Sequence, residues 1–168
     1  MSLETPGALP TLLLIDADGA SLNSVRLTLG QIGFTQVQTA RDGRQGQQVL
    51  DGMAQAPDFI ICDVFMPHMD GIEFMFDLAK RGYQGRVVLV DGGSDEMLSI
   101  AVDIAVALGL NVLAAFGKPL RADALQSLFG TGDGGLRRSA PSPESVWDER
   151  TEGVRRGSVP GPDQGRVE

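Results

Sequence analysis

An apolar segment that ends in a carboxylate constrains the fold of this chain more than any other feature of its sequence. The run of residues 59–62 leads directly into Asp63, and a loop containing Pro67 then reaches Asp70 and Gly71, where an amphipathic segment begins. Apolar runs of this length between turn signals are typical of strands buried in a parallel sheet. Open α/β sheets place their chemistry at the carboxyl ends of such strands. We therefore expect Asp63 to belong to a functional site.

Strand-like and helix-like segments alternate up to about residue 129. The strand-like runs are residues 11–15, 36–39, 58–62, 86–90 and 111–115. Between them apolar residues recur at steps of three and four, as at Leu22, Val25 and Leu29, which is the spacing of one helix face. The expected helix N-caps are Ser21 and Ser94, and the expected glycines at helix C-termini are Gly33, Gly82 and Gly109. Five strand–helix repeats predict an α/β domain with a doubly wound, five-stranded parallel sheet.

Charge and cysteine content exclude several classes of function. A formal net charge of −8 and a pI near 4.6 argue against binding nucleic acid through a basic face. The single cysteine, Cys62, falls in a predicted strand, so we expect no disulfide framework and a reducing compartment. No apolar run approaches membrane-spanning length, and the N-terminus lacks the features of a signal peptide. We expect a cytoplasmic protein that acts without a membrane or nucleic acid.

Composition and hydrophobic pattern divide the chain into three parts. Residues 1–10 are expected to be flexible, residues 11–130 to form the domain, and residues 131–168 to be a disordered tail. The tail is rich in glycine, proline and charged residues, and it lacks the apolar periodicity needed to offset the entropy of ordering it.

Ending the chain after Gly130 is therefore expected to leave the thermal midpoint of unfolding unchanged. Thermal unfolding of the full and shortened chains, followed by circular dichroism, measures this. A loss of several degrees would mean that a tail residue, such as Trp147, docks on the domain.

Charged residues gather where four of the predicted strands end. Asp16, Asp63 and Asp91 follow the first, third and fourth strands, and Lys118 follows the fifth. Because parallel strands end at one edge of a sheet, we expect these four side chains to surround one crevice. Crowded carboxylates favour a cation, and Mg²⁺ prefers such oxygen ligands. A lysine opposite a metal-bound aspartate would neutralise a phosphoryl group that the carboxylate attacks.

The block from Asp63 through Met66-Pro67 to Asp70-Gly71, together with Lys118-Pro119, resembles the receiver domain of bacterial two-component response regulators. The resemblance covers about residues 12–129 and implies a flavodoxin-like fold with strand order 2-1-3-4-5. It implies that Asp63 accepts a phosphoryl group from a histidine kinase or phosphotransfer protein, and that Lys118 contacts the phosphoryl oxygens. It also implies that Asp16, Asp63 and the Phe65 carbonyl bind Mg²⁺, that the peptide bond before Pro119 is cis, and that the domain signals to a protein effector rather than acting as an enzyme.

A finer resemblance concerns the long stretch from Asp91 to Lys118. It is similar to the receiver subgroup often joined to cyclic-di-GMP phosphodiesterase domains of the EAL type. Since the 38 residues after Gly130 are too few for such a domain, the chain is expected to be a stand-alone receiver.

Three positions depart from the receiver pattern. Ala17 stands where the family has a second metal-binding acid, Asp91 where it has Ser or Thr, and Ala115 where many members have an aromatic switch residue. Asp91 is open to three interpretations: a relocated metal ligand, an ion-pair partner of Lys118, or a cap of the following helix.

Two other functions remain open at this stage. The departures favour a degenerate pseudo-receiver that binds proteins without phosphorylation. The segment from Leu12 to Gly19 also resembles the first motif of haloacid-dehalogenase-type phosphatases, in which Asp16 would be the nucleophile and Asp18 the general acid. That interpretation leaves the block around Asp63 unexplained.

Overall fold

The computed structural model describes residues 10–130, so the segments predicted to be flexible lie outside it except for Pro10, which is buried. The strands are β1 Thr11–Ile15, β2 Gln36–Ala40, β3 Phe59–Asp63, β4 Arg86–Asp91 and β5 Asn111–Gly117. The helices are α1 Gly19–Ile32, α2 Gly43–Gly52, α3 Gly71–Lys80, α4 Asp95–Ala107 and α5 Ala122–Phe129. In this part of the chain no helix is both long enough and apolar enough to cross a membrane.

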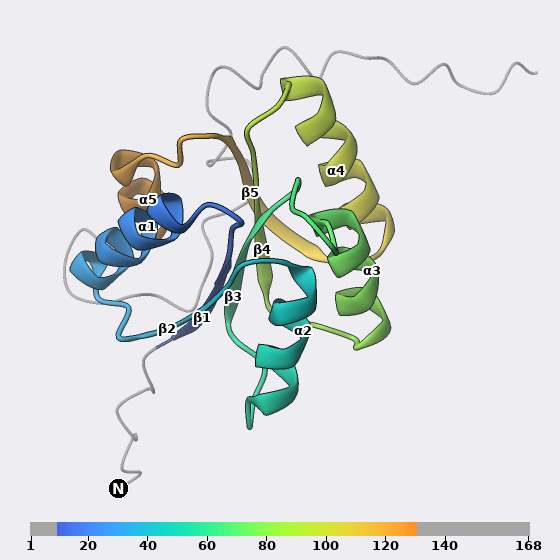
Figure 1. The fold of residues 1–168 in the computed structure, drawn as a ribbon, viewed down its shortest axis with the longest axis horizontal. Coiled ribbons are helices and arrows are strands. Elements are labelled where there is room, and N and C mark those ends of the chain that lie inside the picture. Colours follow the sequence, from blue (N-terminus) through green and yellow to red (C-terminus); the bar gives the residue numbers. More distant parts are fainter. Residues whose placement is uncertain (1–9, 131–168) are drawn as a thin grey trace, which may run out of the picture.

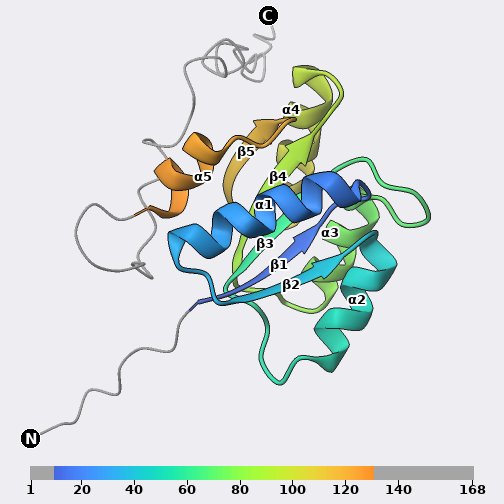
Figure 2. The ribbon, with the colours of Figure 1, turned by 60° about the vertical axis from the view of Figure 1, so that its left-hand side comes forward.

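The five strands form one parallel sheet in the order β2-β1-β3-β4-β5, which confirms the predicted doubly wound fold. Helices α1 and α5 cover one face of the sheet, and α2, α3 and α4 cover the other (Figures 1 and 2). Because every strand points the same way, all five carboxyl ends lie at one edge.

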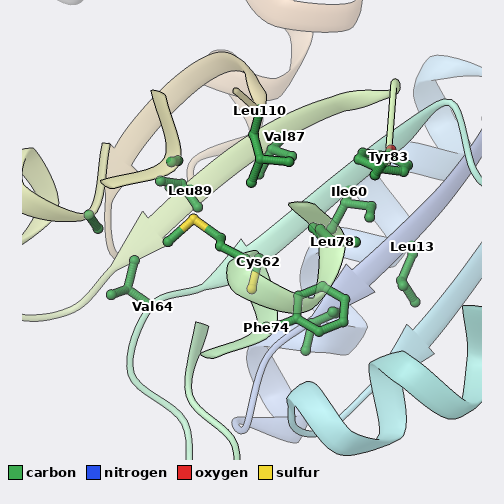
Figure 3. Packing of buried hydrophobic residues seen from close by; sticks show 14 of the residues in the cluster. Leu13, Ile60, Cys62, Val64, Phe74, Leu78, Tyr83, Val87, Leu89 and Leu110 are labelled. Carbon is green, nitrogen blue, oxygen red and sulfur yellow. The ribbon is translucent and has the colours of Figure 1, made fainter. Parts of the chain in front are cut away.

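Each face of the sheet buries its own apolar cluster, since successive side chains of a strand point to opposite faces. The cluster under α1 and α5 includes three aromatic rings, Phe34, Phe59 and Phe129, which meet edge to face at centroid distances of 5.0 to 5.9 Å. The cluster under α3 and α4 includes Phe74 and Leu78, which pack against strand residues such as Ile60 (Figure 3). Most of the driving force for folding comes from burying these two clusters.

The predicted helix ends agree with the structure except at the start of α1. Ser94 caps α4, and Gly33, Gly82 and Gly109 take positive φ angles after helices α1, α3 and α4. The prediction that Ser21 caps α1 is wrong, because the helix already begins at Gly19 and Asp18 accepts the capping hydrogen bond from the Ala20 amide.

Strand β3 lies one residue later than predicted. Asp58 lies just before the strand, where its carboxylate accepts hydrogen bonds from the amide and hydroxyl of Thr11. At the other end the ladder continues through Asp63, which pairs in register with Val90. Strand β4 also extends one residue further than predicted, to Asp91, which pairs with Gly117 of β5. Both acids therefore lie inside the sheet, and both are buried.

Candidate functional site

A lysine and two aspartates meet at the carboxyl edge of the sheet. The Lys118 ammonium lies 2.6 Å from Oδ2 of Asp63 and 2.9 Å from Oδ1 of Asp16. These residues come from the ends of β3, β1 and β5, so the topology brings together groups up to 102 positions apart in the chain. The peptide bond from Lys118 to Pro119 is cis, as the resemblance implied.

Local backbone contacts hold Asp63 in place. The Phe65 amide donates to Oδ1 of Asp63, and the Gly71 amide donates to the carbonyl of Val64. A Cβ at Gly71 would lie 2.5 Å from the Asp63 carbonyl oxygen, so only glycine allows α3 to start this close to β3. Asp70 caps α3 by accepting from the Glu73 amide. The Asp-Gly pair in the sequence therefore fixes the backbone behind Asp63.

Asp16 has more hydrogen-bond donors than Asp63. In addition to Lys118, it accepts from the Asp18 amide at Oδ1 and from the Ser21 hydroxyl at Oδ2. The bond from Ser21 to Asp16 was not predicted, because the sequence pattern indicated a helix cap at Ser21. The available signal is a serine in the first turn of a helix that follows an acid at a strand end.

These unequal environments move the pKa values of the two carboxyl groups in opposite directions. Burial raises the pKa of Asp16, but hydrogen bonds from Lys118, Ser21 and the Asp18 amide outweigh burial and leave this pKa below its ordinary value. Burial also raises the pKa of Asp63, and there it outweighs the hydrogen bond from Lys118, with Asp16 adding a like charge, so this pKa lies above its ordinary value. Burial lowers the pKa of Lys118, but its bonds to the two carboxylates prevail and raise it. The pKa of one carboxyl group of the pair therefore lies below its ordinary value, and the pKa of the other lies above it.

Removing the Ser21 hydroxyl is expected to raise the pKa of Asp16, since one donor to its ionised form disappears. Ser21→Ala should lower the unfolding free energy by about 0.5 to 1.5 kcal/mol at neutral pH. Because a depressed carboxyl pKa stabilises the folded state only above the unfolded-state pKa, this deficit should vanish as the pH falls through the folded pKa of Asp16. Carboxyl ¹³C titration and urea unfolding between pH 2 and pH 7 measure both effects, with Ser24→Ala on the exposed surface of α1 as the control. An unmoved Asp16 pKa would contradict the assigned bond.

Asp91 does not join the other three side chains, contrary to the expectation of one crevice. Leu12 and Leu14 of β1 pack under α1 and α5, as do Phe59 and Ile61 of β3. Because side chains alternate along a strand, Asp16 and Asp63 continue these two series on the same face. By the same alternation, Asp91 follows Val87 and Leu89, which lie on the opposite face under α3 and α4. All the strand ends share one edge, but an acid one position out of phase points to the other side of the sheet.

Among the residues that the structure describes, the Asp91 carboxylate has no hydrogen-bond partner at either oxygen. It forms no ion pair with Lys118, whose ammonium forms ion pairs with Asp16 and Asp63. It does not cap α4, because Ser94 does. Two of the three interpretations of Asp91 from sequence therefore fail.

The remaining donor set bears on the expected Mg²⁺. Within residues 10–130 no group of three or more His, Cys, Asp or Glu side chains is arranged to hold a metal. Asp16 and Asp63 supply two carboxylates, and the Phe65 carbonyl follows in the same loop. Mg²⁺ in proteins keeps several waters and takes one or two carboxylates together with phosphate oxygens, so the chemistry of these donors fits the ion. With Ala17 in place of a further acid, they provide less negative charge than three carboxylates would.

Comparisons with known proteins agree with this geometry. Residues 12–128 match the family model for the response regulator receiver domain. The chain is 33% identical over 86 residues to the probable C4-dicarboxylate response regulator DctR of Priestia megaterium, covering 51% of this chain and 37% of that protein. It is 37% identical over 90 residues to the Regulator of RpoS of Escherichia coli, covering 54% of this chain and 24% of that protein. The chain thus spans well under half the length of these relatives.

A solved structure extends the comparison to the fold. A response regulator from Colwellia psychrerythraea is 29% identical to this chain and superposes with a TM-score of 0.62. The match covers 71% of this chain and 93% of that one. The shared fold therefore includes most of the residues described here.

Proposed function

The chain belongs to the response regulator receiver family of two-component systems, and we propose from this premise that Asp63 accepts a phosphoryl group from a histidine kinase or a histidine phosphotransfer protein. One observation carries the proposal: the Lys118 ammonium lies 2.6 Å from a buried carboxylate at the carboxyl end of β3. A carboxylate whose pKa is raised by burial is a stronger nucleophile than an exposed one. A fixed cation beside it neutralises charge on the incoming group.

The proposed transfer forms one bond and breaks one. An Asp63 carboxylate oxygen attacks phosphorus, and the phosphorus–nitrogen bond to the donor histidine breaks as its imidazole leaves. With a small donor such as acetyl phosphate, the phosphorus–oxygen bond to the acetyl group breaks and acetate leaves. Lys118 keeps its proton throughout and contacts the phosphoryl oxygens, while Asp16 holds the lysine from its other side.

Mg²⁺ is typical of this family, and we propose that Asp16, Asp63 and the Phe65 carbonyl hold it here. When bound, it supplies positive charge to the phosphoryl oxygens. With Ala17 replacing an acid, we expect weak binding.

Transmission of the signal belongs to the same proposal. We propose that the phosphorylated domain acts in the cytoplasm by binding a protein effector and catalyses no turnover of its own. The stretch from Asp91 to Lys118 supports the proposal that this domain is related to the receiver subgroup often joined to EAL-type domains. We propose residues 11–130 as the receiver unit that carries this role.

Incubation with acetyl phosphate and MgCl₂ is expected to add one phosphoryl group to the full chain, seen by intact-mass spectrometry and lost in mild base. Asp63→Asn should abolish the addition completely, because an amide is not a nucleophile here. Asp70→Asn, which alters a nearby acid that only caps α3, is the matched control and should still be labelled. Undiminished labelling of the Asp63→Asn protein would refute the proposal.

A second function, protein binding without phosphorylation, is favoured by Ala17 at the metal-binding position and by the buried, unpartnered Asp91. The same experiment distinguishes the two. A folded wild-type chain that takes up no label from either acetyl phosphate or a phosphorylated histidine donor would support this second function.

A further inference from the structure

The Asp91 carboxylate is the most anomalous polar group in the part of the chain that the structure describes. The residue is only 3% exposed, and neither oxygen has a hydrogen-bond partner there. Buried acids are almost always paired, because taking a charge out of water without compensation is costly. An unpaired acid of this kind indicates that a cationic partner is missing.

The described residues near Asp91 do not supply that partner. The Lys118 ammonium is held by two other carboxylates on the opposite face of the sheet. The Ser94 hydroxyl lies at the start of α4, where it accepts from the Met97 amide. A metal ion at Asp91 would meet a single carboxylate, because Asp16 and Asp63 follow the side-chain alternation of the opposite face of the sheet. The missing group is therefore expected to come from another molecule.

Small residues lie next to the carboxylate in the sequence and on the neighbouring strand. Gly92 and Gly93 follow Asp91 directly, and both are exposed. A Cβ at Gly93 would lie 3.0 Å from Oδ2 of Asp91, so this exposed glycine lies directly beside the carboxylate. On the neighbouring strand, Ala115 pairs with Leu89 and packs on the same face as Asp91. Asp91 therefore lies next to two exposed glycines and on the same face as a residue without a bulky side chain.

The surface beside these two glycines has apolar and acidic character. Met97 and Ile100, in the first half of α4, are 41% and 45% exposed. Asp95 and Glu96, in the first turn, are exposed acids. A complementary partner presents a cation between apolar side chains, and the net charge of −8 on the chain favours the approach of a basic partner.

We propose that Asp91 is a recognition site for an arginine of a protein partner, which enters beside the Gly92-Gly93 segment while flanking apolar residues pack on Met97 and Ile100. A planar guanidinium can donate two parallel hydrogen bonds to a carboxylate, which matches two oxygens that both lack a partner. This inference rests on the proposed protein-binding role of the domain and names the chemistry of the partner. It does not depend on phosphorylation of Asp63, which lies on the other face of the sheet.

The test uses the full, unphosphorylated chain labelled with ¹⁵N and the peptide acetyl-Leu-Arg-Leu-amide. The matched probe carries citrulline, which is neutral and similar in shape, in place of arginine. Saturable amide shifts are expected at Gly92, Gly93 and Ala115 with the arginine peptide. Its affinity should fall at least about tenfold in Asp91→Asn and with the citrulline peptide, because each change removes one side of a charged pair.

Two further variants serve as controls for this binding experiment. Asp103→Asn removes an exposed acid from α4 and should retain the wild-type affinity, which separates the Asp91 site from general attraction to an acidic surface. Asp91→Thr replaces Asp91→Asn if the latter fails to give a folded spectrum. Equal binding by wild type and the Asp91 variant, equal binding of the two peptides, or no saturable shift with either peptide would overturn the proposal. So would MgCl₂ alone shifting the same amides in an Asp91-dependent way, since that would assign the site to a free cation. None of these outcomes bears on labelling of Asp63.

Discussion

Replacing Lys118 with methionine is expected to lower the unfolding free energy by about 2 to 3 kcal/mol at pH 7. The change leaves Asp16 and Asp63 close together and buried, without the cation that now bridges them. Breaking a fully buried ion pair costs about 3 to 5 kcal/mol, and the 23% exposure of the Lys118 side chain places this case below that range. Urea unfolding of the wild type and the variant measures the difference.

The two carboxyl groups set the pH dependence of this loss of unfolding free energy. Without Lys118, the pKa values of Asp16 and Asp63 should both rise, because the hydrogen bonds and charge that favour their ionised forms are lost. A group with a raised folded-state pKa binds protons more readily in the folded state, so folding is favoured as the pH falls. The deficit should therefore be full at pH 7 and shrink as the pH approaches about 4, the ordinary range of carboxyl groups.

Lys80→Met is the matched control, since Lys80 is the only other lysine of the chain and lies exposed at the end of α3. It should change the unfolding free energy by no more than about 0.5 kcal/mol. An equal loss in both variants, or a deficit at Lys118 that grows on acidification, would contradict the role assigned to Lys118.

The parts of the site that the sequence predicted are those that depend on topology. Apolar runs ending in acids located Asp16 and Asp63 at strand ends, and Lys118 after the last strand. A parallel sheet then brings such residues together whatever their separation in the chain. The strand boundaries were one residue off at Asp63 and Asp91 because an acid at the end of an apolar run was interpreted as lying outside the strand. In the structure the backbone ladder continues through both positions.

The errors concern the direction of side chains and the local hydrogen bonds. Side-chain alternation back to Leu89 and Val87 places Asp91 on the face under α3 and α4, whereas the prediction of one crevice considered only where the strands end. The bond from Ser21 to Asp16 depends on where α1 begins, and helix termini are the least certain feature of a sequence pattern. Sequence composition alone does not determine these contacts, because they depend on a shift of one or two residues.

Replacing Asp91 with threonine is expected to raise the unfolding free energy by about 1 to 3 kcal/mol at pH 7, although most substitutions of buried residues lower it. Both oxygens of the Asp91 carboxylate are buried without a partner, so the variant exchanges an uncompensated carboxylate for a neutral hydroxyl, which costs less to bury. Threonine is β-branched and suits the last position of a strand, where Asp91 pairs with Gly117.

Chemical denaturation of the full chain measures the increase in unfolding free energy. Asp103→Thr, on the exposed face of α4, tests whether making the chain less negative has the same effect. If only Asp91→Thr raises the unfolding free energy, the wild-type chain retains a destabilising acid at this position. Such an acid fits a role in contact with a partner rather than in folding. A loss of similar size would instead show that Asp91 is paired within the chain in solution. The Asp91 carbonyl accepts a hydrogen bond from the Lys118 amide at 2.7 Å, although the carboxylate follows the face opposite Asp63. Labelling of Asp91→Thr with acetyl phosphate therefore tests whether the change in stability reaches the proposed phosphoacceptor pocket.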